Sequence, residues 1–317
     1  MSKVFESIQR LEAESGSVSS ELLSEAKSIF KDSPIPAKPP ATESNGTSSR
    51  TAGPTVAPSA VPNAVSNAGT HVGHDVRRVL PVRLSSASPL LPFTAEELNH
   101  TRAGEQYRII RTKIVQHPRS PRVMAVSSVD SGDGKTVTSV NVAAALALKN
   151  DTKVLLIDCD LRRGRIAELV GFPETPGLTD VLTGAAIGDA IVQTQQFPNL
   201  HILPGGARLA NPTELLDSPQ WHALCQQLRK QFDYVILDTP PIGALADYDL
   251  IQASADGILL VVRPDYTNRT RCLNAINSVS ADRLIGVILN CVEDWFLSRS
   301  SSHYGYYGYS SDNKKGK

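Results

Sequence analysis

The sequence has little of several features that mark particular classes of protein. Lysine plus arginine and aspartate plus glutamate both total 32, so the formal net charge at pH 7 is zero. A chain without net charge has no overall field that would attract nucleic acid or anionic lipid. The longest apolar runs, such as VNVAAALAL and GILLVV, are much shorter than the roughly 20 residues that span a bilayer. We therefore expect no nucleic acid partner and no membrane-spanning helix.

Cysteine is scarce as well. The 4 cysteines stand apart from one another, without the CxxC spacing of zinc and redox sites. The first residues, MSKVFESIQRLEAESG, are polar with apolar positions at helical spacing, which is unlike a secretory signal peptide. These features predict a cytoplasmic protein with reduced and mostly buried thiols.

Composition divides the chain into four parts. Residues 1–33 predict two short amphipathic helices, which would dock on a partner or on the main domain, or else form a weakly helical tail with no partner. Residues 34–91 are rich in Pro, Ser, Ala, Thr and Gly and predict a disordered linker. Residues 92–298 alternate short aliphatic runs with helical stretches and predict one folded domain. Residues 299–317 predict a flexible tail.

Six runs within the folded part have the composition of buried strands. They are RVMAVSS, KVLLIDCD, LHILPGG, YVILDTPP, DGILLVVR and LIGVILNCV. Their alternation with helices predicts an α/β fold with a doubly wound, mostly parallel sheet. Ligands in such sheets bind at the carboxyl ends of the strands, so the chemistry should lie in the residues that follow each strand.

A glycine-bearing loop, SSVDSGDGKT, ends the first of these strands and runs into an apolar helix. Its glycines would let backbone amides turn toward phosphate oxygens, while Lys135 reaches the β- and γ-phosphates and the Thr136 hydroxyl binds Mg²⁺. The pattern GxxxxGK[ST] has glycine where Val129 stands, but the order strand, loop and helix favours a phosphate loop of the P-loop NTPase type. The residues expected to contact ATP here are Ser131, Gly132, Asp133, Gly134, Lys135, Thr136 and Val137.

Acidic residues end two further strands. Asp158 and Asp160 lie two apart and would point the same way, so that one holds metal and the other accepts a proton. Asp238 fits the carboxylate that is linked to Mg²⁺ in P-loop nucleotide hydrolases. Thr136, Asp158 and Asp238 are therefore the predicted metal ligands. Asn290, at the end of the last strand, would hydrogen-bond adenine or serve only as a turn former.

The three motifs resemble, in order and spacing, the Walker A, Walker A′ and Walker B motifs of bacterial tyrosine kinases (BY-kinases), which serve capsule and exopolysaccharide export. The resemblance rests on SSVDSGDGKT, VLLIDCDLRR and VILDTPP and covers residues 92–309. It implies a protein-tyrosine autokinase that uses ATP and Mg²⁺, with Lys135 as a catalytic residue. It also implies Asp158 as the base in preference to Asp160, although the sequence alone does not separate the two.

Two further segments also resemble the family, one before the Walker A motif and one between the Walker A′ and Walker B motifs. Glu105, Arg108 and Arg111 in GEQYRIIR reproduce its ExxRxxR element, which implies a ring of identical subunits. The alternative is an ordinary solvated helix face. Asn211 precedes Pro212 in a segment similar to one that the family has between Walker A′ and Walker B, and we expect it to cap a helix.

Half of the 8 tyrosines crowd together near the end of the chain. The resemblance implies that one subunit offers this cluster to the active site of its neighbour, and glycines between the tyrosines would keep the segment mobile. A Gly/Tyr low-complexity tail without kinase function is the alternative. The predicted phosphorylation sites are Tyr304, Tyr306, Tyr307 and Tyr309.

The resemblance also implies a partner, because the sequence lacks the transmembrane hairpin that some relatives carry. We expect a membrane-embedded polysaccharide chain-length regulator to activate the protein and recruit it to the inner face of the membrane. A partitioning-type ATPase on the same fold is one alternative. Such proteins usually carry a signature lysine early in the phosphate loop, where this chain has Val129, Asp130 and Ser131. A catalytically idle module whose nucleotide state gates assembly is the other.

Overall fold

In the computed structural model the chain is described at residues 78–80 and 102–292, except residues 195, 196, 244 and 265. The predicted N-terminal helices, most of the predicted linker and the tyrosine cluster lie outside the described residues. The predictions made for those segments therefore stay predictions.

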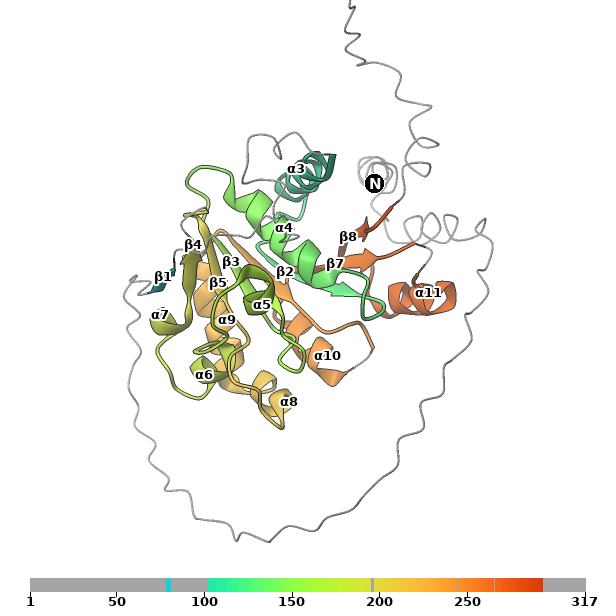
Figure 1. The fold of residues 1–317 in the computed structure, drawn as a ribbon. Coiled ribbons are helices and arrows are strands. Elements are labelled where there is room, and N and C mark those ends of the chain that lie inside the picture. Colours follow the sequence, from blue (N-terminus) through green and yellow to red (C-terminus); the bar gives the residue numbers. More distant parts are fainter. Residues whose placement is uncertain (1–77, 81–101, 195–196, 244, 265, 293–317) are drawn as a thin grey trace, which may run out of the picture.

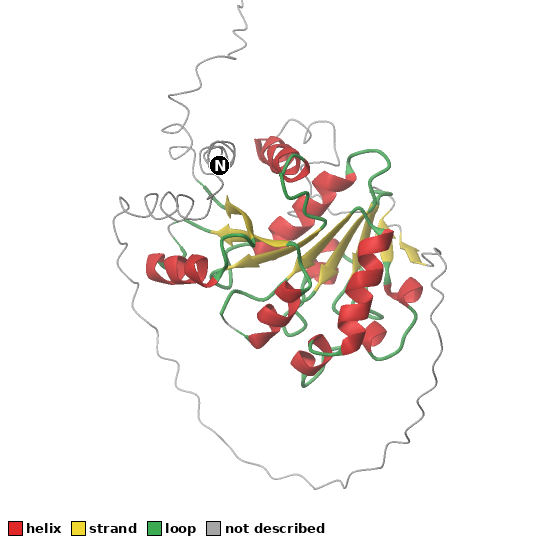
Figure 2. Cartoon of the chain, turned by 180° about the vertical axis from the view of Figure 1, so that it is seen from behind, coloured by secondary structure: helices red, strands yellow, loops and turns green. Residues whose placement is uncertain are grey.

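Within the described residues, eight strands form one sheet with helices on both faces (Figures 1 and 2). The strands are β1 (Arg78–Leu80), β2 (Val123–Ser128), β3 (Val154–Asp158), β4 (Val192–Thr194), β5 (Leu200–Leu203), β6 (Tyr234–Asp238), β7 (Gly257–Val262) and β8 (Leu284–Leu289). The helices are α3 (Arg102–Val115), α4 (Lys135–Ala147), α5 (Ile166–Val170), α6 (Leu178–Leu182), α7 (Ile187–Ala190), α8 (Pro212–Leu216), α9 (Pro219–Gln231), α10 (Ala246–Ala253) and α11 (Arg269–Ser278). None of these helices is both long and apolar enough to cross a bilayer.

The strand order is β1-β4-β5-β3-β6-β2-β7-β8. Neighbouring strands pair in parallel, apart from β4 and β5, which pair antiparallel. This arrangement confirms the predicted doubly wound, mostly parallel α/β sheet, and all six predicted strands are present. Two strands of three residues each, β1 and β4, were not predicted because three residues carry too little pattern. Strand β1 pairs with β4 at one edge of the sheet. The residues of β1 lie within the stretch 34–91 that composition assigned to the linker.

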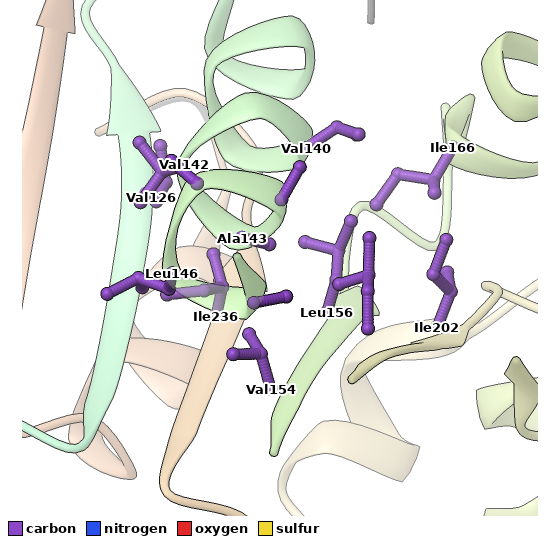
Figure 3. Close-up of a cluster of buried hydrophobic side chains, with 14 of the residues drawn as sticks. Val126, Val140, Val142, Ala143, Leu146, Val154, Leu156, Ile166, Ile202 and Ile236 are labelled. Carbon is purple, nitrogen blue, oxygen red and sulfur yellow. The ribbon is translucent and has the colours of Figure 1, made fainter. Parts of the chain in front are cut away.

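One face of the sheet is covered by α3, α4 and α5. Every residue of β2 and β3 is buried, which explains why these strands are continuously apolar rather than alternating. Figure 3 shows Leu156 of β3 and Ile236 of β6 beside Ala143 and Leu146 of α4. The helix that follows the phosphate loop is therefore fixed to the centre of the sheet by apolar packing.

The opposite face packs against α6, α7, α9 and α10. Trp221 of α9 is fully buried there, together with Leu155 and Ile157, which alternate with the residues of β3 that face α4. Helix α8 begins at Pro212, as the sequence predicted, with Asn211 at the N-cap position. The Asn211 side chain accepts no capping hydrogen bond and its amide instead donates to Glu214, 3.4 Å away, so the expected side-chain cap was wrong.

The topology brings three loops to one edge of the sheet. Strand β2 lies between β6 and β7, and β3 lies on the other side of β6. In the register of the sheet, Asp238 of β6 stands opposite Val126 of β2 and opposite Asp158 of β3. The loops that leave β2, β3 and β6 therefore start side by side at the carboxyl edge, where ligands bind in doubly wound sheets.

We expect Leu156→Ala to lower the free energy of unfolding by about 3 kcal/mol, because it leaves a cavity beneath α4. Leu156 is fully buried in the centre of β3. Urea unfolding followed by circular dichroism measures the change. Val115→Ala is the control because Val115 is 40% exposed on α3, and it should change stability by less than about 0.5 kcal/mol. Equal losses in the two variants would contradict the assignment of the core.

Candidate nucleotide and phosphoryl-transfer site

The phosphate loop has the backbone that its glycines predict. Between the end of β2 and the start of α4, Gly132 and Gly134 have φ angles of 97° and 92°, which only glycine adopts without strain. A Cβ at Gly134 would also lie 2.0 Å from Nδ2 of Asn290. The loop then enters the N-terminus of α4, whose free backbone N–H groups and partial positive charge favour phosphate.

Lys135, the first residue of α4, lies among carboxylates. Its Nζ is 2.9 Å from Oδ2 of Asp160 and 3.7 Å from Oδ2 of Asp238, and only 12% of its side chain is exposed. Burial alone would lower the pKa of Lys135, but the charges of Asp238 and Asp160 outweigh burial and raise it. The ammonium group therefore stays charged and lies beside the loop that would bind phosphate.

Asp238 ends β6 almost completely buried, with 1% of its surface exposed. Its Oδ1 accepts a hydrogen bond of 2.9 Å from the Ser139 hydroxyl, and the Thr136 side chain is a further hydrogen-bond partner. Burial raises the pKa of Asp238, while Lys135 and these hydroxyls act in the opposite direction. The carboxylate and the Thr136 hydroxyl thus lie together at the start of α4.

Asp158 is held by backbone amides. Its Oδ2 accepts hydrogen bonds from the N–H groups of Arg165 and Ile166 at 2.9 and 3.0 Å, and its Oδ1 from the N–H of Asp160 at 3.2 Å. Burial, followed by the nearby charge of Asp238, raises the pKa of Asp158 to about 7. A carboxyl group with this pKa exchanges protons near neutral pH.

Asp160 differs from Asp158 in what it contacts. Its Oδ2 is the acceptor for Lys135, and its Oδ1 accepts the N–H of Arg163 at 3.2 Å. The structure therefore brings Lys135, Asp160 and Asp238 into one cluster, with Asp158 beside it at the end of β3. The assignment of the base to Asp158 or Asp160 stays a prediction.

The donors at this edge fit a magnesium nucleotide. Among the residues that the structure describes, no three His, Cys, Asp or Glu side chains form a group that could hold a metal by themselves. Mg²⁺ in nucleotide sites is bound by one or two carboxylates together with substrate phosphates, and it prefers oxygen ligands. Asp238 and the Thr136 hydroxyl supply such oxygens, and the loop amides and Lys135 supply positive partners for the phosphates. Asp158, the third predicted ligand, has both carboxylate oxygens engaged by backbone N–H groups.

The remaining predicted nucleotide contacts surround the same loop. The Asn290 amide donates a hydrogen bond of 2.8 Å to the carbonyl oxygen of Asp133, so Asn290 supports the phosphate loop from the end of β8. The carbonyl oxygen of Ser131 accepts a hydrogen bond from the Tyr266 hydroxyl, and that of Val137 accepts one from the Asn141 amide. Contact between Asn290 and adenine stays a prediction.

Two residues at this edge, Thr213 and Asp247, were not predicted from the sequence. The guanidinium of Arg162 donates to Asp247 at 2.8 Å and to the Thr213 hydroxyl at 2.9 Å. Burial would raise the pKa of Asp247, but hydrogen bonds from Arg162 and Thr213 lower it, so the carboxylate is charged. This network ties the loop after β3 to α8 and α10. Asp247 and Thr213 are 85 and 51 positions from Arg162, too distant for any local pattern to pair them.

The ExxRxxR element lies on α3, which packs against α4 (Figure 1). Arg108 forms an ion pair with Glu105 one turn away. Arg111 lies half-buried and lines a surface pocket together with Lys149 and Tyr234. The triplet is thus on a helix that contacts the nucleotide-binding helix, and its role between subunits stays a prediction.

Comparisons with known proteins agree with this geometry. A family model described as an AAA domain matches residues 121–282. The tyrosine-protein kinase CpsD of Streptococcus agalactiae is 34% identical over 223 residues, which cover 69% of this chain and 94% of CpsD. The tyrosine-protein kinase YwqD of Bacillus subtilis is 36% identical over 209 residues, covering 65% of this chain and 86% of YwqD.

Solved structures give the same result. The kinase domain of VpsO matches with a TM-score of 0.55 and 31% identity, covering 60% of this chain and 97% of that one. The kinase domain of the Escherichia coli tyrosine kinase ETK matches with a TM-score of 0.55 and 29% identity, covering 65% and 80%.

The doubly wound sheet and its glycine loop, with the matching AAA model, define a P-loop domain that binds nucleotide. Within that class, the chain belongs to the bacterial tyrosine-protein kinases. This confirms the family and the fold that the three sequence motifs indicated.

The raised pKa of Asp158 predicts a pH-dependent stability for the nucleotide-free chain. The pKa in the folded state is about 7, whereas an aspartate in an unfolded chain titrates near 3.9. The resulting stabilisation is complete below about pH 4 and is lost as the pH rises through 7. Relative to Asp158→Asn, the wild-type chain should therefore lose up to about 1.4 kcal/mol of unfolding free energy per pH unit over this range.

Urea unfolding at pH 5, 6, 7 and 8 tests this expectation. Asp249→Asn, at an exposed position of α10 outside the site, is the control for the effect of an Asp-to-Asn change itself. A flat difference for Asp158→Asn would show that Asp158 is ionised throughout.

Proposed function

We propose that this chain is an ATP-dependent protein-tyrosine autokinase. It would phosphorylate the tyrosines of its C-terminal cluster in trans and so regulate the polymerisation and export of a capsular or exopolysaccharide. The observation that carries the proposal is the position of Lys135. Its charged ammonium group lies between Asp160 and Asp238, next to the phosphate loop. Membership in the tyrosine-protein kinase family supports the tyrosine as acceptor.

Phosphoryl transfer depends on alignment and charge neutralisation more than on covalent catalysis. In the proposed enzyme the loop amides and Lys135 hold the terminal phosphates of ATP. Asp238 and Thr136 hold Mg²⁺, which supplies charge neutralisation and orients the phosphates when it is bound. Lys135 would exchange its contact with Asp160 for a phosphate oxygen, because both partners are anionic and the phosphate carries more charge.

An acceptor tyrosine needs a base for its hydroxyl proton. The pKa of about 7 suits Asp158 to that role, since the group is partly ionised at neutral pH. Release of Asp160 from Lys135 would free a second carboxylate at the same edge. The proposal keeps Asp158 as the base and assigns Asp160 to holding Lys135 in place before nucleotide binds.

The cellular setting of the proposal comes from the family resemblance. Identical subunits would form a ring through Glu105, Arg108 and Arg111, so that each active site receives the tail of a neighbour. A membrane-embedded polysaccharide chain-length regulator would activate the cytoplasmic kinase and bring it to the inner face of the membrane. Four phosphates would add roughly −6 to −8 charges to each cluster, enough to repel neighbouring tails and loosen the ring.

Autophosphorylation in trans can be tested by mixing two inactive variants. Lys135→Met keeps the tail but should lose activity at least a hundredfold, because it removes a positive group from the transferring phosphate. Changing Tyr304, Tyr306, Tyr307 and Tyr309 to Phe keeps the site but removes the acceptors. With ATP and Mg²⁺, anti-phosphotyrosine detection should show no signal from either variant alone and a signal on the Lys135→Met chain in the mixture.

Lys153→Met is the matched control, because Lys153 is exposed at the opposite end of β3 and should leave the signal intact. ATP hydrolysis by the wild-type chain without phosphotyrosine would instead support a partitioning-type ATPase. Absence of both activities would support an idle assembly module.

The ring can be tested separately. Replacing Glu105, Arg108 and Arg111 together with alanine should convert an oligomer into a monomer in light scattering. Arg165→Ala combined with Glu168→Ala is the control, since it removes an exposed ion pair with the spacing of Glu105 and Arg108 at the start of α5. An unchanged mass for the triple variant would refute the role of ExxRxxR in assembly.

A further inference from the structure

The phosphate loop carries two carboxylates of its own, Asp130 and Asp133. A loop that binds phosphate through backbone N–H groups gains affinity from positive potential, and each nearby negative charge reduces it. Neither residue belongs to the cluster around Lys135. The structure should therefore contain something that offsets these two charges.

Asp133 is turned away from solvent, with none of its surface exposed. Its Oδ2 accepts a hydrogen bond of 2.8 Å from the N–H of Asp130, across the loop. Its Oδ1 accepts one of 2.8 Å from the hydroxyl of Thr267, which lies in the segment between β7 and α11. The Asp133 charge is thus directed into the loop and toward that segment.

Asp130 is offset by an arginine four positions after Thr267. Its Oδ1 is 2.6 Å from Nη2 of Arg271, and 15% of its side chain is exposed. Arg271 lies in the first turn of α11, where its N–H donates to the capping side chain of Asn268. A cation near a helix N-terminus is unfavourable for the helix, and the first turn of α11 has no acidic residue. Partnership with Asp130 supplies a reason for an arginine at this position.

Tyr266 makes the third contact from this segment to the phosphate loop. Its hydroxyl donates to the carbonyl oxygen of Ser131 at 3.4 Å, and a Cβ at Gly132 would lie 3.0 Å from the same hydroxyl. The guanidinium of Arg263 lies 4.9 Å from the centre of the Tyr266 ring. One short segment therefore contacts three residues of the loop, Asp130, Ser131 and Asp133.

We infer that residues 266–271 form a phosphate-loop clasp, which offsets the charge of Asp130 through Arg271, holds Asp133 through Thr267 and so tunes the affinity of the loop for nucleoside di- and triphosphates. Thr267 and Arg271 are positioning residues in this clasp. They act on the nucleotide through Asp133 and Asp130 and need not touch it. The inference rests on the proposed function only as far as the binding of nucleotide at this loop.

Substitutions of Arg271 and of Asp130 should change the affinity for nucleotide in different ways. Arg271→Gln leaves the Asp130 charge uncompensated and should weaken nucleotide binding about fivefold at low salt. Asp130→Asn removes the charge itself and should leave binding unchanged or stronger. The double variant should return to within about twofold of wild type. A contact that only supported the fold would instead make both single variants weaker.

Equilibrium titration of the full-length chain with N-methylanthraniloyl-ADP and Mg²⁺ measures these affinities without requiring kinase activity. The loss in Arg271→Gln should shrink between 50 and 300 mM salt, because ions screen exposed charges. Arg269→Gln is the matched control, since Arg269 is exposed in the same helical turn and should bind as wild type does. Thermal unfolding of each variant shows whether the fold is intact.

Thr267→Val and Thr267→Ser test the second half of the clasp. Valine removes the donor to Asp133 and should weaken binding roughly tenfold, whereas serine retains the hydroxyl and should bind within twofold of wild type. Wild-type affinity in both Arg271→Gln and Thr267→Val would overturn the clasp, as would weakening in Arg271→Gln that the double variant fails to restore. A chain that shows the expected affinities but forms no phosphotyrosine would overturn the proposed kinase and leave the clasp standing.

Discussion

The contact of one ammonium group with two carboxylates organises the carboxyl edge of this sheet. Lys135 starts α4, Asp160 follows β3 and Asp238 ends β6, so their meeting requires that helix and both strands to keep their relative positions. Apolar packing secures this, because α4 lies on buried residues of β3 and β6 (Figure 3). The electrostatic cluster would be costly to bury if its charges were not paired. The apolar packing of α4 on the sheet therefore also holds the charged groups of the site in place.

The carboxylates at this edge are not equivalent, although they lie close together. Asp158 is held by three backbone N–H groups and has a pKa raised to about 7, whereas Asp160 contacts Lys135 directly. Asp238 interacts with the hydroxyl groups of Ser139 and Thr136 in the first turns of α4. The three neighbouring acids therefore differ in their surroundings, and strongly perturbed acids of this kind are common at functional sites.

The parts of this structure that were predictable are those that sequence spacing encodes locally. The phosphate loop, its glycines and the acidic strand ends were found because each motif lies within about ten residues, and the parallel sheet followed from buried strands alternating with helices. Strands β1 and β4 were missed because three residues show no period. Pairing of Arg162 with Asp247, and of Arg271 with Asp130, depends on tertiary distance and had no sequence signal. Asn211 was expected to cap α8 from residue preference alone, and its side chain contacts Glu214 instead.

The ties of Arg162 to Thr213 and Asp247 bear on how this edge of the sheet can move. Arg162 follows Asp160 by two positions, so a displacement of that loop pulls on α8 and α10 through short, charged hydrogen bonds. Three segments that are remote along the chain are coupled mechanically in this way. The loop that carries Asp160, the partner of Lys135, is therefore linked to α8 and α10 through a single arginine side chain.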